Sequence, residues 1–137
     1  MPGCIFRVAG ENFDVDGFIA ESCWKDFAEI YHKGEQQSFR AEPHVRSGFQ
    51  ISVSDIGEHE LEPQIQDTID FLTEYSAEFQ RLMNYPGIEY ADFDIGLFFT
   101  KDMVMKTLSI PPALSKLAGE LGCIIMLSIY RASVDET

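Results

Sequence analysis

Residues 90–99, YADFDIGLFF, are the most regular stretch of the chain. Apolar side chains occupy every second position from Ala91 to Phe99, and Tyr90, two aspartates, a glycine and Phe98 occupy the positions between them. Because successive side chains of a strand point to opposite faces of a sheet, this alternation predicts a long strand with one buried face. The rest of the fold is expected to assemble around that face.

A long amphipathic segment precedes this strand. Between Glu60 and Asn84, apolar residues recur at spacings of three, four and seven, which predicts a single helix with an apolar stripe. Pro63 falls in the first turn, where its missing amide hydrogen costs nothing. Pro86 and Gly87 then end the helix.

Shorter periodic segments fill the rest of the chain. Further strands are predicted within residues 4–9, 24–31, 49–53 and 123–130, and further helices around residues 18–20 and between 109 and 121. The resulting order, β-α-β-β-α-β-α-β, predicts an α+β fold with a single, largely antiparallel sheet and helices packed on one face. Residues 1–137 are expected to form one domain, with residues 132–137 as a flexible tail.

The composition limits the possible partners. The hydrophobic fraction of 45% is typical of a folded protein. The formal net charge of −13 shows that the chain has no excess of basic side chains with which it could bind phosphate groups. We therefore expect neither nucleic acid nor an anionic membrane as a partner. The cysteines are widely spaced and no secretory segment is recognisable, so a cytoplasmic protein with reduced thiols is expected.

No catalytic or metal-binding signature stands out. His32, His44 and His59 are 12 and 15 residues apart, which does not match the spacing of zinc ligands. The chain also lacks a P-loop, a G-x-G-x-x-G motif and a G-x-S-x-G motif. We therefore expect a non-enzymatic protein with no metal and no cofactor.

Acidic residues are concentrated in one block. Residues 47–100 hold eleven acidic residues and a single basic residue, Arg81. Five of the acids fall within about 80° of one another on the predicted helix, opposite its apolar stripe: Glu60, Asp67, Asp70, Glu74 and Glu78. A one-sided negative surface attracts a basic partner, so this face is a candidate docking surface, and a merely solvated helix face is the alternative.

Two further features are candidates for the same surface. Asp92 and Asp94 share one face of the strand at 90–99, about 7 Å apart by the rise of a strand. They are either solvent-facing acids that contribute to the acidic surface, or a functional pair that acts as acid and base or as Mg²⁺ ligands. Trp24, the sole tryptophan, is either partly buried or an exposed anchor for a partner.

Three short motifs occur in a recognisable order. The first strand leads through Gly10 into the turn at 12–16, NFDVD; the turn KGE follows at 33–35, and LSKLAGELG at 114–122 runs into the last strand. In this order they resemble a small, mostly bacterial family catalogued as domain of unknown function 4279. Val15 departs from that family, where proline is usual, and the strand at 49–53 lacks the expected tryptophan. The resemblance implies a compact α+β fold and no particular reaction; toxin immunity has been suggested for some members.

The leading hypothesis is an acidic protein-binding domain, in its concrete form an immunity protein that neutralises a basic toxin. The alternative is a domain that binds a small ligand, or a self-associating regulatory domain that forms a homodimer through the edge near Trp24. An enzyme that uses Asp92 and Asp94 is a third hypothesis, and it requires a concave pocket that joins both carboxylates to a histidine.

Overall fold

The computed structural model describes residues 3–37, 42–55, 60–100 and 102–131, so the tail predicted at 132–137 lies outside the described residues. The strands are β1 (Cys4–Gly10), β2 (Glu29–Tyr31), β3 (Ser47–Ser54), β4 (Tyr90–Phe99) and β5 (Ile124–Arg131). The helices are α1 (Val15–Ala20), α2 (Leu61–Glu74), α3 (Ser76–Met83) and α4 (Pro112–Glu120). The predicted α+β class is confirmed, and two helices, α2 and α3, stand where the sequence predicts one.

One mixed sheet contains these strands, in the spatial order β2-β3-β1-β4-β5. β1 pairs antiparallel with β3 and with β4, and β2 pairs antiparallel with β3. β5 pairs parallel with β4, since α4 lies in the crossover between these two strands. The sheet is therefore largely antiparallel, as predicted, with one parallel strand at its edge.

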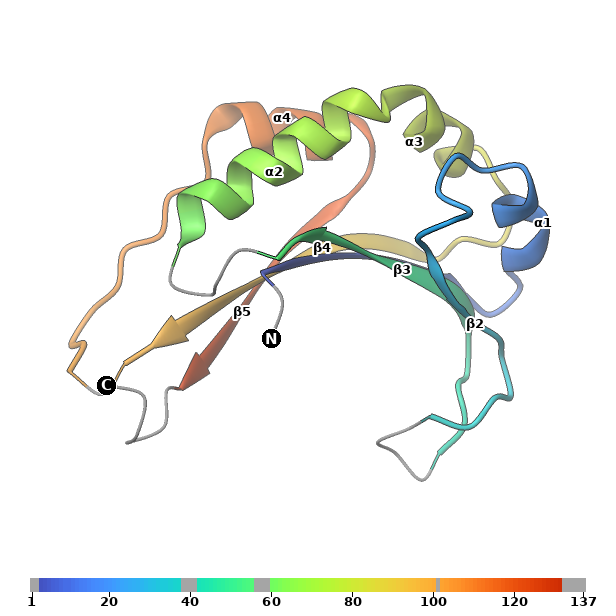
Figure 1. The fold of residues 1–137 in the computed structure, drawn as a ribbon, viewed down its shortest axis with the longest axis horizontal. Helices are drawn as coiled ribbons and strands as arrows, with labels where there is room; N and C mark the ends of the chain where they lie inside the picture. Colours follow the sequence, from blue (N-terminus) through green and yellow to red (C-terminus); the bar gives the residue numbers. More distant parts are fainter. Residues whose placement is uncertain (1–2, 38–41, 56–59, 101, 132–137) are drawn as a thin grey trace.

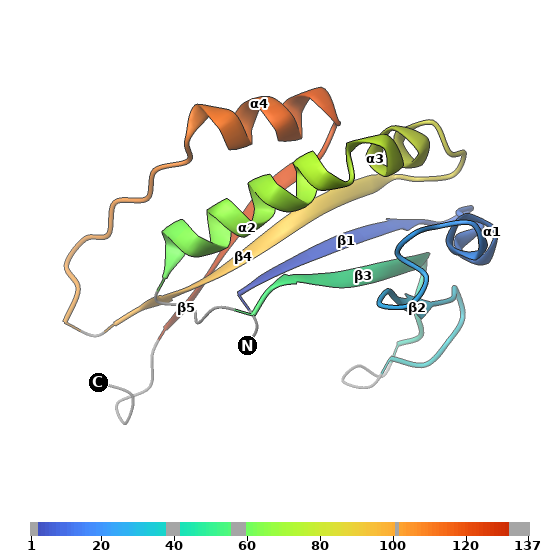
Figure 2. The same cartoon turned by 45° about the horizontal axis from the view of Figure 1, so that its top comes forward.

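The helices divide the two faces of the sheet unequally. α2, α3 and α4 lie on one face, and α1 lies at the end of the sheet near β3 (Figures 1 and 2). The opposite face curves inward, and no helix of the described chain covers it (Figure 1). We call this surface the open face of the sheet.

The core between helices and sheet is strongly aromatic. The Phe6 ring lies at its centre, with ring centroids 4.7 Å from Phe93, 5.1 Å from Phe79 and 5.7 Å from Trp24. Trp24 is fully buried and stacks on Phe71, with 5.7 Å between the ring centroids. The interpretation of Trp24 as an exposed anchor for a partner is therefore wrong.

The reason lies in the turn that carries this tryptophan. The amides of Phe27 and Ala28 both donate to the Trp24 carbonyl, at 3.1 Å and 3.0 Å, so the chain turns here and β2 begins only at Glu29. The turn directs the indole into the core. Burial of so large an apolar side chain outweighs the weak alternation that predicts a strand from residue 24.

The long helix is divided at Tyr75. The backbone of Tyr75 leaves the helical region at φ −105° and ψ 25°, yet its amide still donates to the Phe71 carbonyl at 3.1 Å and its carbonyl accepts from the Phe79 amide at 3.0 Å. The Tyr75 ring packs edge-on against Trp24. The resulting bend lets α2 and α3 follow the curvature of the sheet (Figure 1).

Candidate functional site

The acids of α2 lie on its outer side. The helix packs inward through Gln64, Ile65, Thr68 and Leu72, all of which are buried. Four predicted docking acids lie on the remaining surface, where Asp67 is half-buried and the others are exposed: Glu60, Asp67, Asp70 and Glu74. In the part of the chain that the structure describes, no basic side chain forms an ion pair with these four. We call these four, of which Glu60 is the N-cap residue and the others lie within the helix, the α2 acids.

Glu78, the fifth predicted acid, has a structural role instead. It lies on α3, accepts a hydrogen bond from the Ser22 hydroxyl and pairs with Arg81 at 2.7 Å. Burial raises the pKa of Glu78, but the hydrogen bonds from Arg81 and Ser22 outweigh this effect and hold the pKa below its ordinary value. Arg81 also donates to the Phe18 carbonyl at 2.7 Å, so the pair connects α3 to α1 and Glu78 is removed from the docking surface.

Asp92 and Asp94 are also occupied within the molecule. Arg7 of β1 donates through Nε to Asp92 Oδ1 at 3.1 Å and through Nη2 to Asp94 Oδ2 at 2.9 Å. Asp94 accepts a further hydrogen bond from the Ser128 hydroxyl of β5. The side chains of Asp92 and Asp94 are only 6% and 16% exposed and both pair with Arg7, so the interpretation of these aspartates as solvent-facing acids is wrong. Arg7, Asp92 and Asp94 together are called the Arg7 triad.

The triad forms because β1 and β4 are neighbours in register. Arg7 lies directly opposite Asp92, and Ile5 lies opposite Asp94, so the guanidinium reaches both carboxylates on the open face. Burial raises the pKa of Asp92 above its ordinary value, although Arg7 acts in the other direction. Burial lowers the pKa of Arg7, but the two carboxylates outweigh it and the guanidinium stays charged. The triad thus holds one arginine in a fixed position at the middle of the sheet.

A hollow of about 650 Å³ adjoins the triad on the open face. Its lining includes Arg7, Tyr31, His44, Arg46, Gln50 and Tyr90. The His44 ring stacks on Tyr31, with centroids 4.3 Å apart, and the Arg46 guanidinium lies 5.9 Å from the centre of the Tyr90 ring. Gly48 makes room here, because a Cβ at this position would lie 2.7 Å from the Tyr31 hydroxyl.

The hollow differs from the pocket that the enzyme hypothesis requires. His44 lines it, but neither Asp92 nor Asp94 does, and both carboxylates are directed to Arg7. Burial, together with the neighbouring Tyr90, raises the pKa of Tyr31 to about 12, so this phenol stays neutral at ordinary pH. The groups of the hollow therefore offer hydrogen bonds and ring faces.

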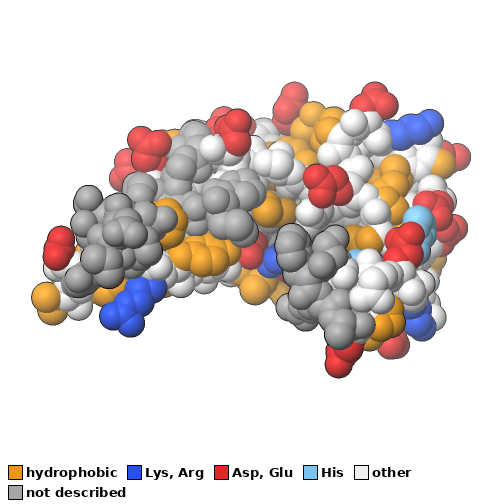
Figure 3. Space-filling view, turned by 60° about the horizontal axis from the view of Figure 1, so that its bottom comes forward, with side chains coloured by type: hydrophobic (Ala, Val, Ile, Leu, Met, Phe, Trp, Pro, Cys, Tyr) orange, Lys and Arg blue, Asp and Glu red, His pale blue; other side chains and the backbone are white. Residues whose placement is uncertain are grey.

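The other half of the open face is apolar. Ile124, Met126 and Tyr130 of β5 are 51%, 40% and 36% exposed, and the Tyr130 ring packs edge-on against Phe98 of β4. Viewed from this side, hydrophobic side chains lie in the middle of the molecule and most acidic side chains lie along its margins (Figure 3). The open face therefore combines an apolar strip, a fixed guanidinium and a polar hollow.

The sequence pattern contained part of this surface. The alternation of β1 and β4 places Arg7, Tyr90 and the two aspartates on the side of the strands that faces away from the core. The contributions of Tyr31, His44 and β5 require the spatial order of the strands, which no local pattern contains. The charge pattern of the sequence does not reveal the open face, because this face is defined by the side of the sheet that the helices leave bare.

Comparisons with family models, curated proteins and solved structures find no match, so the resemblance to domain of unknown function 4279 stays a prediction. Among the described residues, no group of three or more histidine, cysteine, aspartate or glutamate side chains is arranged to hold a metal ion. The described helices are too short or too polar to cross a bilayer.

Proposed function

We propose that this protein is a non-enzymatic, acidic protein-binding domain that holds a basic partner protein on the open face of its sheet. The observation that supports this most directly is the uncovered, inward-curving face, where the apolar strip of β5 lies beside the fixed Arg7 and most acidic side chains lie along the margins (Figure 3). A basic toxin is one partner of the required chemistry.

The side chains of the open face suit an interface. Tyrosine, methionine and arginine are enriched at the centres of protein–protein interfaces, and the face presents Tyr130, Met126 and Arg7. Arg7 is already held by two carboxylates, so a partner meets a side chain that loses little freedom on binding. Both features favour the recognition of a folded protein surface.

The charge of the molecule suits a basic partner. The formal net charge is −13, and the α2 acids keep their charge free of internal ion pairs in the described chain. They lie on the helix side, away from the open face, so we assign them to long-range attraction rather than to contact. The sequence-based hypothesis gives the same acids both this steering role and the docking surface; we keep only the steering role.

A pair of matched variants tests the contact surface. Gln50 lies at the middle of the open face beside Arg7, whereas Ser115 is exposed on α4, on the helix side. Gln50→Arg and Ser115→Arg make the same change in net charge. With a basic protein captured from a lysate of the source organism at low salt, we expect Gln50→Arg to weaken affinity by about tenfold or more and Ser115→Arg to change it little. Equal effects of the two variants would contradict the open face as the contact surface.

The role of the α2 acids has its own measurement. The double variant Asp70→Lys and Glu74→Lys is expected to slow association with the captured protein at low salt and to leave dissociation unchanged. The difference in association rate shrinks at physiological salt, since exposed charges are screened there. A change confined to the dissociation rate would show that these side chains contact the partner directly.

The hollow supports a second candidate function, the binding of a small polar ligand. Its volume of about 650 Å³ lies in the range of ligand sites, and its lining offers tyrosine, glutamine and arginine side chains. Native mass spectrometry of the protein purified from its source organism tests this candidate. A bound mass that the Gln50→Arg variant loses supports it, and a bare protein mass contradicts it.

A further inference from the structure

β5 forms one edge of the sheet. It pairs with β4 over its whole length, from Ile124 opposite Asp92 to Arg131 opposite Phe99. Within the described ranges, no strand pairs with its other side. A strand in this position presents a row of backbone N–H and C=O groups that can pair with another chain.

This edge lacks the features by which proteins usually prevent such pairing. Residues 123–130 contain no charged residue and no proline. Ile124 and Ile129 are 51% and 54% exposed, and the pairing with β4 runs without a register shift. Short length, charges, prolines and bulges are the common protections of an edge strand, and β5 has none of them before Arg131.

The opposite edge of the sheet is different. β2 has only three residues and begins with the exposed Glu29. The homodimer expected from the sequence would use this edge, near Trp24, but Trp24 is buried and the strand is too short to pair extensively. Self-association through a strand edge is therefore expected at β5.

We infer that two copies of this chain pair antiparallel through β5 and form one continuous sheet. The segment is complementary to itself when a two-fold axis passes through Leu127. Side chains on the same face then meet across the new pair: Leu127 with Leu127, Ile125 with Ile129, Ile124 with Tyr130 and Met126 with Ser128. Three of these four kinds of pair are apolar.

The charge distribution favours a second copy at this place. Two molecules that each carry a net charge of −13 repel each other in most orientations. The electrostatic repulsion is smallest where they meet through an uncharged strand. The two open faces would lie on the same side of the joined sheet. The inference does not depend on the basic partner, because the strand pairing uses the backbone edge of β5. Met126 and Tyr130 belong to both surfaces, but Arg7 and Gln50 at the middle of the open face lie away from this edge.

Matched substitutions at the two sheet edges test the inference. Ile129→Glu places an acid on the β5 edge, and Ile30→Glu makes the same change on β2, where Ile30 is 38% exposed. Sedimentation equilibrium from about 1 µM to about 1 mM is expected to show a dimer for the unaltered protein. We expect Ile129→Glu to weaken the dimer by about tenfold or more, since it adds like charges at the paired edge, and Ile30→Glu to leave it unchanged.

Hydrogen exchange supplies a second readout that does not depend on a substitution. Amides along β5 are expected to become more protected as the protein concentration rises, while amides of β2 keep the same protection. A monomer over the whole concentration range would overturn the inference. A dimer that forms without added protection of β5, or one that both substitutions weaken equally, would overturn it as well. If Ile129→Glu still binds a basic partner normally, any of these failures concerns the dimer alone and not the proposed function.

Discussion

At the scale of single residues, the Arg7 triad makes a clear prediction. Replacing Arg7 with methionine keeps much of the side-chain volume but leaves Asp92 and Asp94 without their counter-charge. Removing one partner of a buried ion pair costs about 3–5 kcal/mol, and we expect about 3 kcal/mol at neutral pH because Arg7 remains one-third exposed. Urea unfolding of the two proteins measures the loss in the free energy of unfolding.

The pH dependence of that loss identifies its cause. Without Arg7, the pKa of Asp92 in the folded variant rises further, because burial then acts without an opposing charge. A raised carboxyl pKa means that stability present at low pH is lost as pH rises through the folded value. The variant should therefore approach the unaltered protein near pH 4 and fall behind it toward pH 7. Adding Asp92→Asn should close much of the gap, and a deficit independent of pH would point to lost packing instead.

The triad also shows which features of single residues can be predicted from local sequence and which cannot. Alternation places Arg7 on the side of β1 that points away from the core, and it places Asp92 and Asp94 on the equivalent side of β4. That the two sides coincide follows only from the pairing of strands 85 residues apart. The burial of Trp24 could not be predicted for a related reason, because it depends on contacts with Phe71 and Phe79 in distant segments of the chain.

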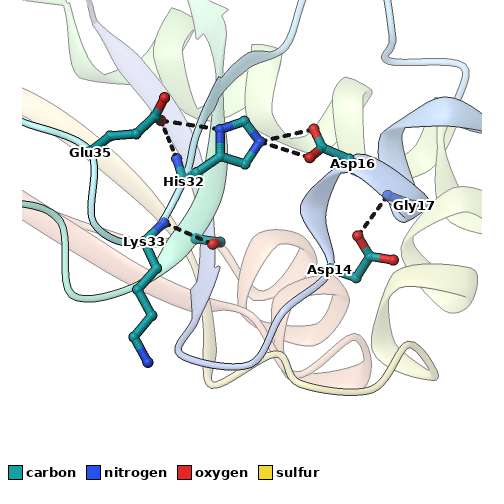
Figure 4. A network of polar contacts seen from close by, with 7 residues as sticks. Asp14, Asp16, Gly17, His32, Lys33 and Glu35 are labelled. Carbon is teal, nitrogen blue, oxygen red and sulfur yellow. Dashed lines mark hydrogen bonds and ion pairs between the residues drawn. The ribbon is translucent and has the colours of Figure 1, made fainter.

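At the scale of elements, a histidine connects α1 to the segment after β2 (Figure 4). His32 Nε2 lies 2.8 Å from Asp16 Oδ2 in the first turn of α1, and Nδ1 lies 3.1 Å from Glu35 Oε1. The next residue continues the connection, because the Lys33 amide donates to the Ser47 hydroxyl at 2.9 Å. These contacts place the start of β3, the turn after β2 and α1 side by side.

This connection is expected to depend on pH. The hydrogen bond with Asp16 raises the pKa of His32, and Glu35 acts in the same direction. A raised histidine pKa stabilises the fold fully below the unfolded value of about 6.5, and the stabilisation is lost as pH rises through the folded value. In Asp16→Asn, NMR titration should show a lower pKa for His32, and thermal unfolding should vary less between pH 6 and pH 8. An unchanged His32 pKa would show that Glu35 alone sets it.

Elements with a strong period were predictable, and those fixed by distant contacts were not. The strand at 90–99 and the helical segment from Glu60 have long, regular apolar patterns, so their burial follows from local sequence. The division at Tyr75 and the late start of β2 arise where aromatic side chains pack into a shared core. The parallel pairing of β5 depends on the path of the chain through α4, which periodicity does not describe.

At the scale of the whole molecule, folding redistributes the acidic block. Arg7 and Arg46, which lie outside residues 47–100 in the sequence, pair with Asp92, Asp94 and Glu89 of that block, and Arg81 pairs with Glu78. The sequence-based expectation of one acidic side is thus reduced to the α2 acids. The acids that are not paired with arginine act mainly through the electrostatic field around the protein, and the strength of this field depends on the salt concentration.

The two proposed interactions must therefore respond to salt in opposite directions. Raising ionic strength from about 10 mM to about 150 mM shortens the Debye length from about 30 Å to about 8 Å. Two copies that each carry −13 then repel less, so pairing through β5 should strengthen, whereas attraction to a basic partner should weaken. Sedimentation equilibrium and association rates of the unaltered protein at both salt concentrations measure the two trends. A dimer that weakens with salt would mean that charged groups, such as Arg131 at the end of β5, hold the copies together in place of an uncharged strand edge.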